Sequence, residues 1–394
     1  MKVKIVKRSV CSSIDKYWWA FIIMLVGISF NVHAVSNMAL VNSTVSTSYG
    51  TDDNVYKTEK NAIADEYQLV NMEIKLGLDY SKINLTSGYV GNYSNYKKSL
   101  DLNREEHKIH AIANYQGPIW LFTLRSLYEV SHDEKGDPGT STQFSPIPVE
   151  YKEKKAQFLG KYGGSRKDLG TNVTYDYIDK KFQTLANSSL NNIRNVAVIT
   201  HAQPWTGKTS YLFQLSVSNT EFTNIPTAQN AYQEYSVSTG AEWDISGKTT
   251  GSALIGTSWV SAPGRDALDG LDIRTSIDAI WRRKSYSVIG IKLTRNLVAS
   301  SDRIGSMSVT NGLSMSLNHT FTRRIGASAA ATGIVNEYQN TNSIFLGLSL
   351  GMNVNVFKKV RIAVNGNAGT GGVNSFTPDY AAKSIVITAT MGLM

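Results

Sequence analysis

Apolar and small or polar side chains alternate along residues 343–366 for about 13 positions, which is the period of a β-strand with one apolar face. The apolar set is Ile344, Leu346, Leu348, Leu350, Met352, Val354 and Val356. Most of the intervening positions hold Gly, Ser or Asn. What the apolar face contacts, a protein core or lipid, decides what this chain can fold into.

Composition limits the choice of fold class. The chain has 394 residues, of which 18% are charged, below the quarter that is usual for soluble domains, and 42% are apolar. Its mean hydropathy is -0.20. These values exclude a disordered chain and a helical membrane protein, while barrels exceed the usual domain length as single domains.

The N-terminus resembles an export signal. A basic segment precedes an apolar run over residues 18–30, and Val32-His33-Ala34 resembles a signal-peptidase site. We therefore expect a signal peptide over residues 1–34 and one mature domain over residues 35–394. A single membrane anchor is the alternative, although the apolar run is short for a spanning helix.

The only cysteine, Cys11, lies within this predicted signal. The mature chain then has no thiol, which excludes disulfide scaffolds, Cys-ligated zinc and cysteine nucleophiles. Removing the signal takes away five basic residues and Asp15, so the formal charge of +9 falls to about +5. The charge does not indicate a nucleic-acid partner.

Short turns alternate with longer polar connections along the mature chain. The eight short turns are predicted near residues 80–82, 116–118, 163–166, 205–208, 246–248, 282–284, 323–324 and 357–359. The nine longer connections are predicted at 51–66, 95–104, 131–149, 179–191, 221–231, 262–271, 298–305, 338–340 and 370–381. Together they predict an all-β, antiparallel, up-and-down transmembrane barrel of about 18 strands, with 16 as the alternative count. We expect it in the bacterial outer membrane with both termini periplasmic.

The composition of the two strand faces favours lipid outside and water inside. Along residues 211–218 the apolar face holds Tyr211, Phe213, Leu215 and Val217, while the other face holds Leu212 and polar residues. A soluble barrel would instead expose charge on its outer face. A secreted β-sandwich or solenoid is the remaining alternative.

Aromatic residues gather beside the predicted short turns, where an interfacial girdle would lie. They are Tyr80, Tyr115, Trp120, Tyr162, Trp205, Tyr211, Trp243, Trp281 and Phe357. Ordinary core aromatics are the alternative interpretation.

The loop sequences carry a family resemblance. DDNVYKTEKNAIADEY (52–67), GYVGNYSNYKKSLDLNREEHKI (88–109) and SLYEVSHDEKGDPGT (126–140) resemble the putative β-barrel porin 2 family, outer-membrane barrels associated with capsule and exopolysaccharide loci. The resemblance implies an 18-stranded barrel that takes part in exporting a capsular polysaccharide or exopolysaccharide. It also implies a periplasmic polysaccharide-export protein as a partner, and it carries no catalytic motif.

Charged residues in the strands are expected to face the lumen, because Arg or Lys on the lipid face costs roughly 2–4 kcal/mol near the bilayer midplane. They could orient a hydrated sugar chain, or could simply pair across strands and stiffen the wall. The lumen candidates are Glu73, Lys75, Asp79, Lys108, His110, Arg125, Glu129, Glu234, Glu242, Arg274, Asp278, Lys292 and Arg361.

Basic residues crowd the short turns. A periplasmic rim of this kind could bind anionic lipid, attract an acidic polysaccharide or dock an export partner, or could be a solvated rim that prevents edge aggregation. The rim candidates are Lys208, Lys248, Arg282, Arg283, Lys284, Arg323, Arg324, Lys358 and Lys359.

No enzymatic pattern stands out. The histidines of the mature region are dispersed over different segments without a nucleophile signature, and the sequence 132–137 lacks any standard metal-ligand spacing. We expect no catalysis, no cofactor and no metal. Two transport functions remain: polysaccharide export, favoured by the family resemblance, and a passive or sugar-selective diffusion porin whose long third loop, 131–149, folds inward.

Overall fold

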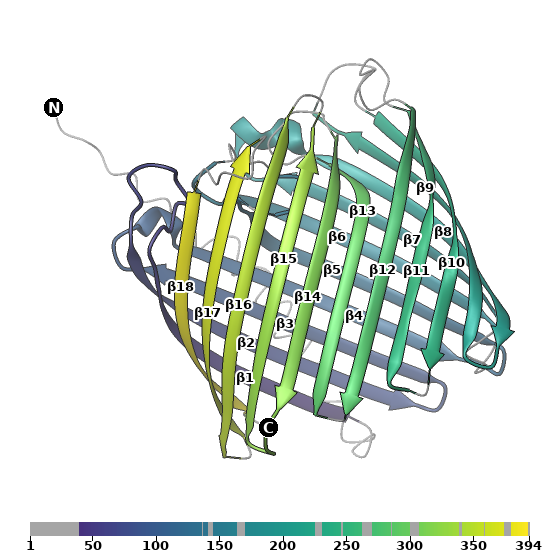
Figure 1. Ribbon diagram of the computed structural model, residues 1–394, viewed down its shortest axis with the longest axis horizontal. Helices are drawn as coiled ribbons and strands as arrows, with labels where there is room; N and C mark the ends of the chain where they lie inside the picture. Colours follow the sequence, from purple (N-terminus) through teal and green to yellow (C-terminus); the bar gives the residue numbers. More distant parts are fainter. Residues whose placement is uncertain are drawn as a thin grey trace.

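The computed structural model is one closed antiparallel barrel (Figure 1). It describes residues 39–135, 137–140, 145–163, 170–224, 231–245, 247–261, 270–284, 286–299, 307–338, 341–357, 359–373 and 380–392. The predicted signal peptide, residues 1–34, lies outside these residues.

Eighteen strands follow one another in chain order. They are β1 (Ala39–Asp52), β2 (Asp65–Tyr80), β3 (Ile83–Tyr96), β4 (Arg104–Gln116), β5 (Trp120–Asp133), β6 (Val149–Tyr162), β7 (Gly170–Phe182), β8 (Asn192–Thr206), β9 (Thr209–Phe222), β10 (Ala231–Ile245), β11 (Thr249–Ser261), β12 (Gly270–Lys284), β13 (Ser287–Ala299), β14 (Met307–Thr320), β15 (Ile325–Glu337), β16 (Asn342–Phe357), β17 (Val360–Val373) and β18 (Tyr380–Gly392). Two short 3-10 helices, η2 (Leu100–Leu102) and η3 (Leu185–Leu190), lie in the connections.

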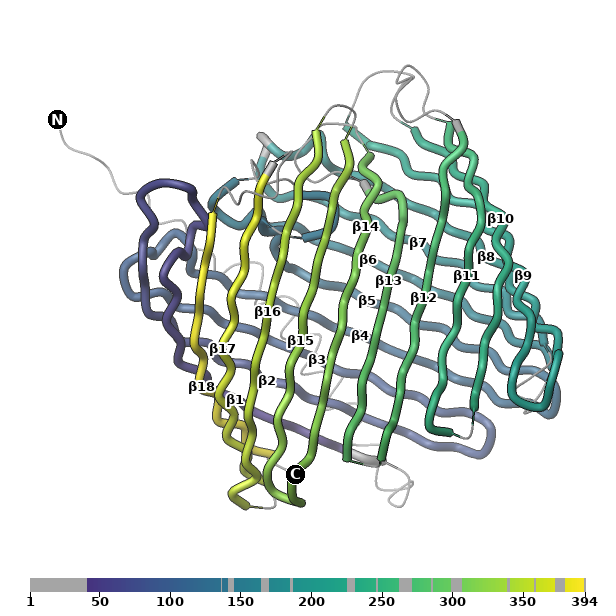
Figure 2. Tube along the Cα trace, in the orientation of Figure 1, coloured from purple at the N-terminus to yellow at the C-terminus, as the bar shows by residue number. Residues whose placement is uncertain are grey.

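The barrel closes between its first and last strands. β1 pairs with β2 along its whole length and with β18 from Thr44↔Gly392 to Asp52↔Ser384. Each strand from β2 to β17 pairs with its two neighbours in sequence, and the chain can be followed up and down the wall in Figure 2. The predicted up-and-down barrel is confirmed with 18 strands rather than 16.

The alternating pattern separates two environments. On β16 the side chains of Leu346, Leu348, Leu350 and Met352 are 50–56% exposed although they are apolar, and they lie on the outer face. Buried polar residues such as Ser216, Ser236 and Ser258 lie on strand positions opposite to the exposed apolar residues. Because lipid solvates apolar groups and water solvates polar ones, the apolar band faces lipid and the polar face lines the lumen.

The connections separate by length as predicted, with short turns at one end of the barrel and long loops at the other. The described chain starts and finishes at the short-turn end, near Ala39 and Gly392. One turn was placed wrongly: Arg282, Arg283 and Lys284 still belong to β12, and β13 begins at Ser287. A register shift between Arg282 and Lys284 accommodates the extra strand residue.

Aromatic side chains form a band at the short-turn end. Trp120 lies 4.7 Å from Tyr162 between ring centroids, and Trp205 lies 5.0 Å from Tyr211. These rings are exposed on the outer surface, where amphipathic aromatic groups occupy the interface between hydrocarbon and headgroups. Ring packing across neighbouring strands also stabilises the sheet where the turns begin.

A charge at mid-strand should distinguish the two faces. We expect Leu348→Lys to destabilise the barrel by roughly 2–4 kcal/mol, because Leu348 faces lipid, and Ser349→Lys on the lumen face to have almost no effect. Urea unfolding in lipid vesicles measures both. Equal destabilisation by the two variants would contradict the assignment of the faces.

Candidate functional site

The lumen wall carries the charged residues that the sequence predicted to line it. All thirteen candidates lie on strands, at positions that alternate with the exposed apolar side chains. Several are paired: Lys75 Nζ lies 2.7 Å from Glu73, Lys108 lies 3.7 Å from Glu129, and Arg274 lies 3.5 Å from Glu234. The charges are thus largely balanced within the wall.

The remaining candidates occupy defined positions in the sheet. Arg125 donates to Gln157 at 3.2 Å, and Asp79 accepts from Asn84. Asp278 lies directly across from Lys292, and Glu242 across from Ser252. Arg361 lies across from Asn355.

His110 lies across from Gly88, where a side chain would collide with its ring. A Cβ at position 88 would lie 2.5 Å from His110 Cε1. The glycine therefore makes room for the imidazole on the lumen face.

Loop 3, the connection between β5 and β6 (residues 134–148), reaches the opposite wall of the barrel. Asn336 Nδ2 on β15 donates to Thr140 O at 2.7 Å, and Gly139 N donates to Asn336 Oδ1 at 3.3 Å. Tyr338 Oη donates to Gly139 O at 3.1 Å. β6 and β15 are nine strands apart in either direction around the closed sheet of 18. Loop 3 therefore crosses the lumen at the long-loop end.

Asn336 is the anchor of this contact. It is fully buried and also accepts a hydrogen bond from Thr310 Oγ1 at 2.7 Å, so its amide joins β14, β15 and loop 3. Its partner Thr140 is equally buried. Because a buried amide without partners is costly, removing either side of this contact should release the loop.

Cations hold the first residues of loop 3. Glu134 accepts from Lys57 at 3.3 Å and also pairs with Arg104. Lys57 Nζ donates to Lys135 O at 2.9 Å, and Lys135 Nζ donates to Lys57 O at 3.2 Å. Loop 3 and the β1–β2 connection are therefore held together by hydrogen bonds in both directions.

The carboxyl groups of loop 3 have opposite pKa shifts. Burial alone would raise the pKa of Glu134, but the Lys57 and Arg104 cations outweigh it and hold that pKa below its ordinary range. Burial raises the pKa of Asp137, and the neighbouring Glu134 carboxylate contributes to the rise against the backbone hydrogen bond from Glu134 N. Glu134 therefore stays ionised at neutral pH as part of the loop anchor.

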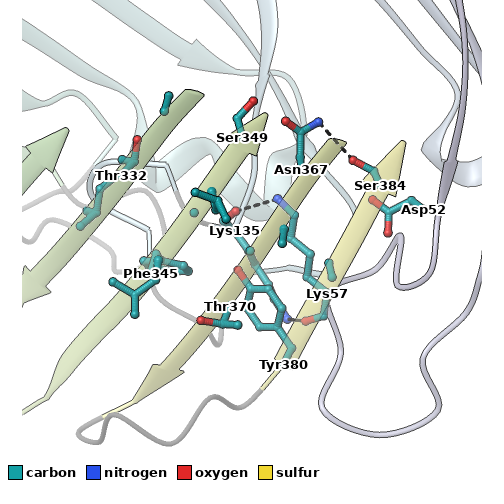
Figure 3. Close-up of a pocket in the computed structure, with 18 of the residues that line it drawn as sticks. Asp52, Lys57, Lys135, Thr332, Phe345, Ser349, Asn367, Thr370, Tyr380 and Ser384 are labelled. Atoms are coloured by element: carbon teal, nitrogen blue, oxygen red, sulfur yellow. Dashed lines mark hydrogen bonds between the residues drawn. The ribbon is translucent and has the colours of Figure 1, made fainter. Parts of the chain in front are cut away.

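A cavity of about 430 Å³ remains between loop 3 and the wall formed by β15 to β18 (Figure 3). Two lysines and two acids line it, namely Lys57, Lys135, Asp52 and Asp137. The wall contributes polar side chains and two rings: Thr332, Ser349, Asn367, Ser384, Phe345 and Tyr380. Asn367 Nδ2 donates to Ser384 Oγ at 3.3 Å. This cavity is lumen space that loop 3 leaves free.

A second element narrows the mouth from another side. The upper ends of β13 and β14 carry Leu297, Met307 and Val309, which form a buried apolar cluster with the lumen-facing side chains Phe222, Tyr232 and Val260. Leu297 and Val309 alternate in step with Ile291 and Leu313, which are exposed on the outer face lower in the same strands. The end of this hairpin is therefore turned inward against β9 to β11.

The basic rim candidates lie at the short-turn end. Lys208, Lys248, Arg323, Arg324 and Lys359 are in turns, Arg282 to Lys284 end β12, and Lys358 lies outside the described residues. Arg282 donates to Thr250 Oγ1 at 3.2 Å. Their proposed role toward lipid, polysaccharide or a partner stays a prediction.

Sequence reasoning missed several residues of the lumen wall and of the mouth. Arg194 and Asp176 lie on the lumen face and follow the same alternation that identified the other charges, so the existing signal could have found them. Asn336, Tyr338 and Lys57 had no such signal, because their role depends on loop 3 crossing the barrel. Within the described residues, no group of three His, Cys, Asp or Glu residues is placed to hold a metal ion.

The closed wall, the lipid-facing band and the polar lumen make this chain a channel-forming β-barrel of the outer-membrane class. No family model and no curated protein matches it. OccK2 (OpdF) of Pseudomonas aeruginosa has a similar structure, with a TM-score of 0.48, 9% identity, and coverage of 90% of this chain and 98% of that one. The siderophore receptor PirA of the same organism has a TM-score of 0.44 and 7% identity, covering 90% of this chain and 80% of that one. These likenesses concern the barrel fold, and the resemblance to the porin 2 family stays a prediction.

Acidification should loosen loop 3. Because the folded pKa of Glu134 is depressed, its ion pairs stabilise the docked loop fully above the ordinary glutamate pKa, and this stabilisation is lost as pH falls through the folded value. We expect steady single-channel current at neutral pH and flickering only at a pH below the ordinary range of glutamate pKa values.

Glu134→Gln should flicker already at neutral pH, since it removes the charge that Lys57 and Arg104 contact. Glu73→Gln, which removes a lumen carboxylate from the wall, is the matched control. A steady Glu134→Gln channel at neutral pH would show that this carboxylate does not hold the loop.

Proposed function

We propose that the protein is a diffusion channel for small hydrophilic solutes across the outer membrane. The observation that carries this proposal is loop 3, which crosses the lumen and is hydrogen-bonded to Asn336 and Tyr338 on the far wall. A loop fixed at both sides of a barrel divides its mouth and sets the size of what can pass. The polar lumen below supplies the aqueous path.

The mouth favours small solutes over long chains. Loop 3 spans it in one direction, and the inward-turned end of β13 and β14 fills the side next to β9 to β11. A polysaccharide passing through would have to displace the buried Asn336 contact along its whole transit. A small solute can instead use the cavity beside β15 to β18.

The lining of that cavity suits molecules rich in hydroxyl groups. Asn, Ser and Thr side chains offer neutral donors and acceptors, and the Tyr380 ring offers a flat apolar surface. The two lysines are already engaged with loop 3 and its neighbours, so they do not form a strong anion trap. Weak, repeated contacts of this kind permit conduction, because a solute must leave as readily as it enters.

Polysaccharide export remains the other prediction for this chain. It rests on the resemblance of the loops, and it implies a polysaccharide chain and a periplasmic export protein as partners. Export requires loop 3 to leave the mouth. The experiment on Asn336 therefore separates the two functions.

Asn336→Ala should widen the channel. The substitution removes the side-chain amide that binds Thr140 O and Gly139 N, and both backbone groups lose this partner. Leaving such groups unsatisfied costs about 1–3 kcal/mol, which is enough to undock the loop. We expect a larger single-channel conductance and faster swelling of proteoliposomes in larger oligosaccharides. The wild-type protein should admit only small sugars.

Asn353→Ala is the matched control, since Asn353 faces the same lumen from β16 and donates to Gly326 O rather than to loop 3. It should keep the wild-type size limit. A wild-type barrel that is closed to small sugars and conducts only with a long polysaccharide would overturn the proposal in favour of export.

A further inference from the structure

The barrel wall splits between β12 and β13 at the long-loop end. Their ladder runs from Lys284↔Ser287 to Thr275↔Arg295 and stops there, although β12 continues to Gly270 and β13 to Ala299. β12 stays paired with β11 as far as Val260↔Gly270. Figures 1 and 2 show the end of β13 curving away from β12. We call this split the seam.

One side chain bridges the seam. Arg295 Nε donates to the carbonyl oxygen of Ile273 on β12 at 3.1 Å. This side chain thus gives the carbonyl group a hydrogen-bond partner where the β13 backbone no longer pairs with β12. Its Nη2 lies 2.9 Å from Asp272 on the same strand, and its Nη1 lies 3.2 Å from Glu337 on β15. Asn311 Oδ1 on β14 accepts from Nη1 at 2.8 Å. The guanidinium thus joins β12 to β14 and β15 where the backbone ladder is interrupted.

Apolar surface lies on both sides of the seam. On the outside, Leu271 is 72% and Ile273 58% exposed. On the inside lies the cluster that contains Leu297, Met307 and Val309. An apolar cluster inside the mouth offers no hydrogen-bonding groups to water or to a hydrophilic solute. Here only the seam lies between this cluster and the lipid-facing outer wall.

The depth of the seam fits the boundary of the outer leaflet. Trp259 on β11 is paired directly with Leu271 and is also exposed, which places a tryptophan beside the seam at the long-loop end of the apolar band. Asp272, Glu337 and Arg295 carry a net charge of -1 at this point. That charge disfavours an anionic headgroup.

We propose that the seam is a lateral passage by which small, uncharged apolar molecules move from the channel mouth into the outer leaflet, with Arg295 as its latch. The molecule contacts the apolar cluster, displaces the end of β13, and leaves between β12 and β13 past Ile273. The passage is closed in this structure, because the cluster residues are buried and the latch is formed. This route is separate from the aqueous path beside β15 to β18.

A cysteine pair can test the latch, because the only native cysteine is Cys11, outside the predicted mature chain. The double variant Ile273→Cys with Arg295→Cys removes the latch, and a short reducible bismaleimide then replaces it by a covalent bridge. The readout is uptake of the neutral dye N-phenyl-naphthylamine by intact cells that carry the protein in the outer membrane. The matched control is Ile277→Cys with Leu293→Cys, a directly paired position in the intact ladder of the same two strands.

We expect the unlinked seam variant to take up dye several-fold faster than wild type, and cross-linking to reduce uptake to that of cells without the protein. Reduction of the linker should restore the fast uptake, and linking the control pair should change nothing. Single-channel conductance of the linked seam variant should equal that of the unlinked one, which separates this passage from the aqueous channel. Heat-modifiable migration on gels verifies that each variant is folded.

Uptake that is insensitive to the seam linker in a folded barrel would overturn the proposal. An equal fall in dye uptake and ionic conductance would do the same, because it would mean that both use the aqueous lumen.

Discussion

The backbone hydrogen bond is the constraint on which this structure depends. In hydrocarbon no water satisfies a free N–H or C=O group, so a sheet can span the membrane only if it has no edge. The pairing of β1 with both β2 and β18 removes the edge, and it requires an unbroken up-and-down sequence of strands. The alternation of side chains then follows, because a closed wall has one face toward lipid and one toward the lumen.

The same constraint explains how the barrel tolerates its two irregular regions. Loop 3 exposes backbone groups inside the mouth, and Asn336 and Tyr338 satisfy those at Gly139 and Thr140. At the seam, β12 loses its neighbour, and the Arg295 side chain supplies the missing donor for Ile273. In both places side chains replace ladder hydrogen bonds. The irregular backbone therefore depends on a few residues, and substituting one of them should affect only the region that it holds.

The strands and their number were predictable because they repeat a local rule. Each strand shows side-chain alternation with a period of two, as in residues 344–356, and polar turns separate the strands. The error fell at a turn, Arg282 to Lys284, where a bulge lengthens the strand by a residue. The mouth was less predictable. The length of loop 3 indicated that it could fold inward, but its landing on Asn336 depends on a contact between positions almost 200 apart in the chain. The inward turn of Leu297 also breaks the alternation rule, since its parity alone assigns it to lipid.

The inward-turned end of β13 and β14 and the crossing of loop 3 together determine where free space remains in the lumen. The end of β13 and β14 occupies the lumen beside β9 to β11, and loop 3 crosses toward β15, so the free space lies against β15 to β18. That wall carries small residues where the cavity lies, including Ala330, Gly347 and Gly369, and a Cβ at position 347 would meet no atom within 4 Å. The glycines of the opening strand pattern thus do more than mark the lumen face, because they leave the volume that loop 3 does not fill. If the barrel conducts small solutes as proposed, a bulky residue at position 347 would narrow the path without touching the loop, so this strand would limit solute size together with the loop.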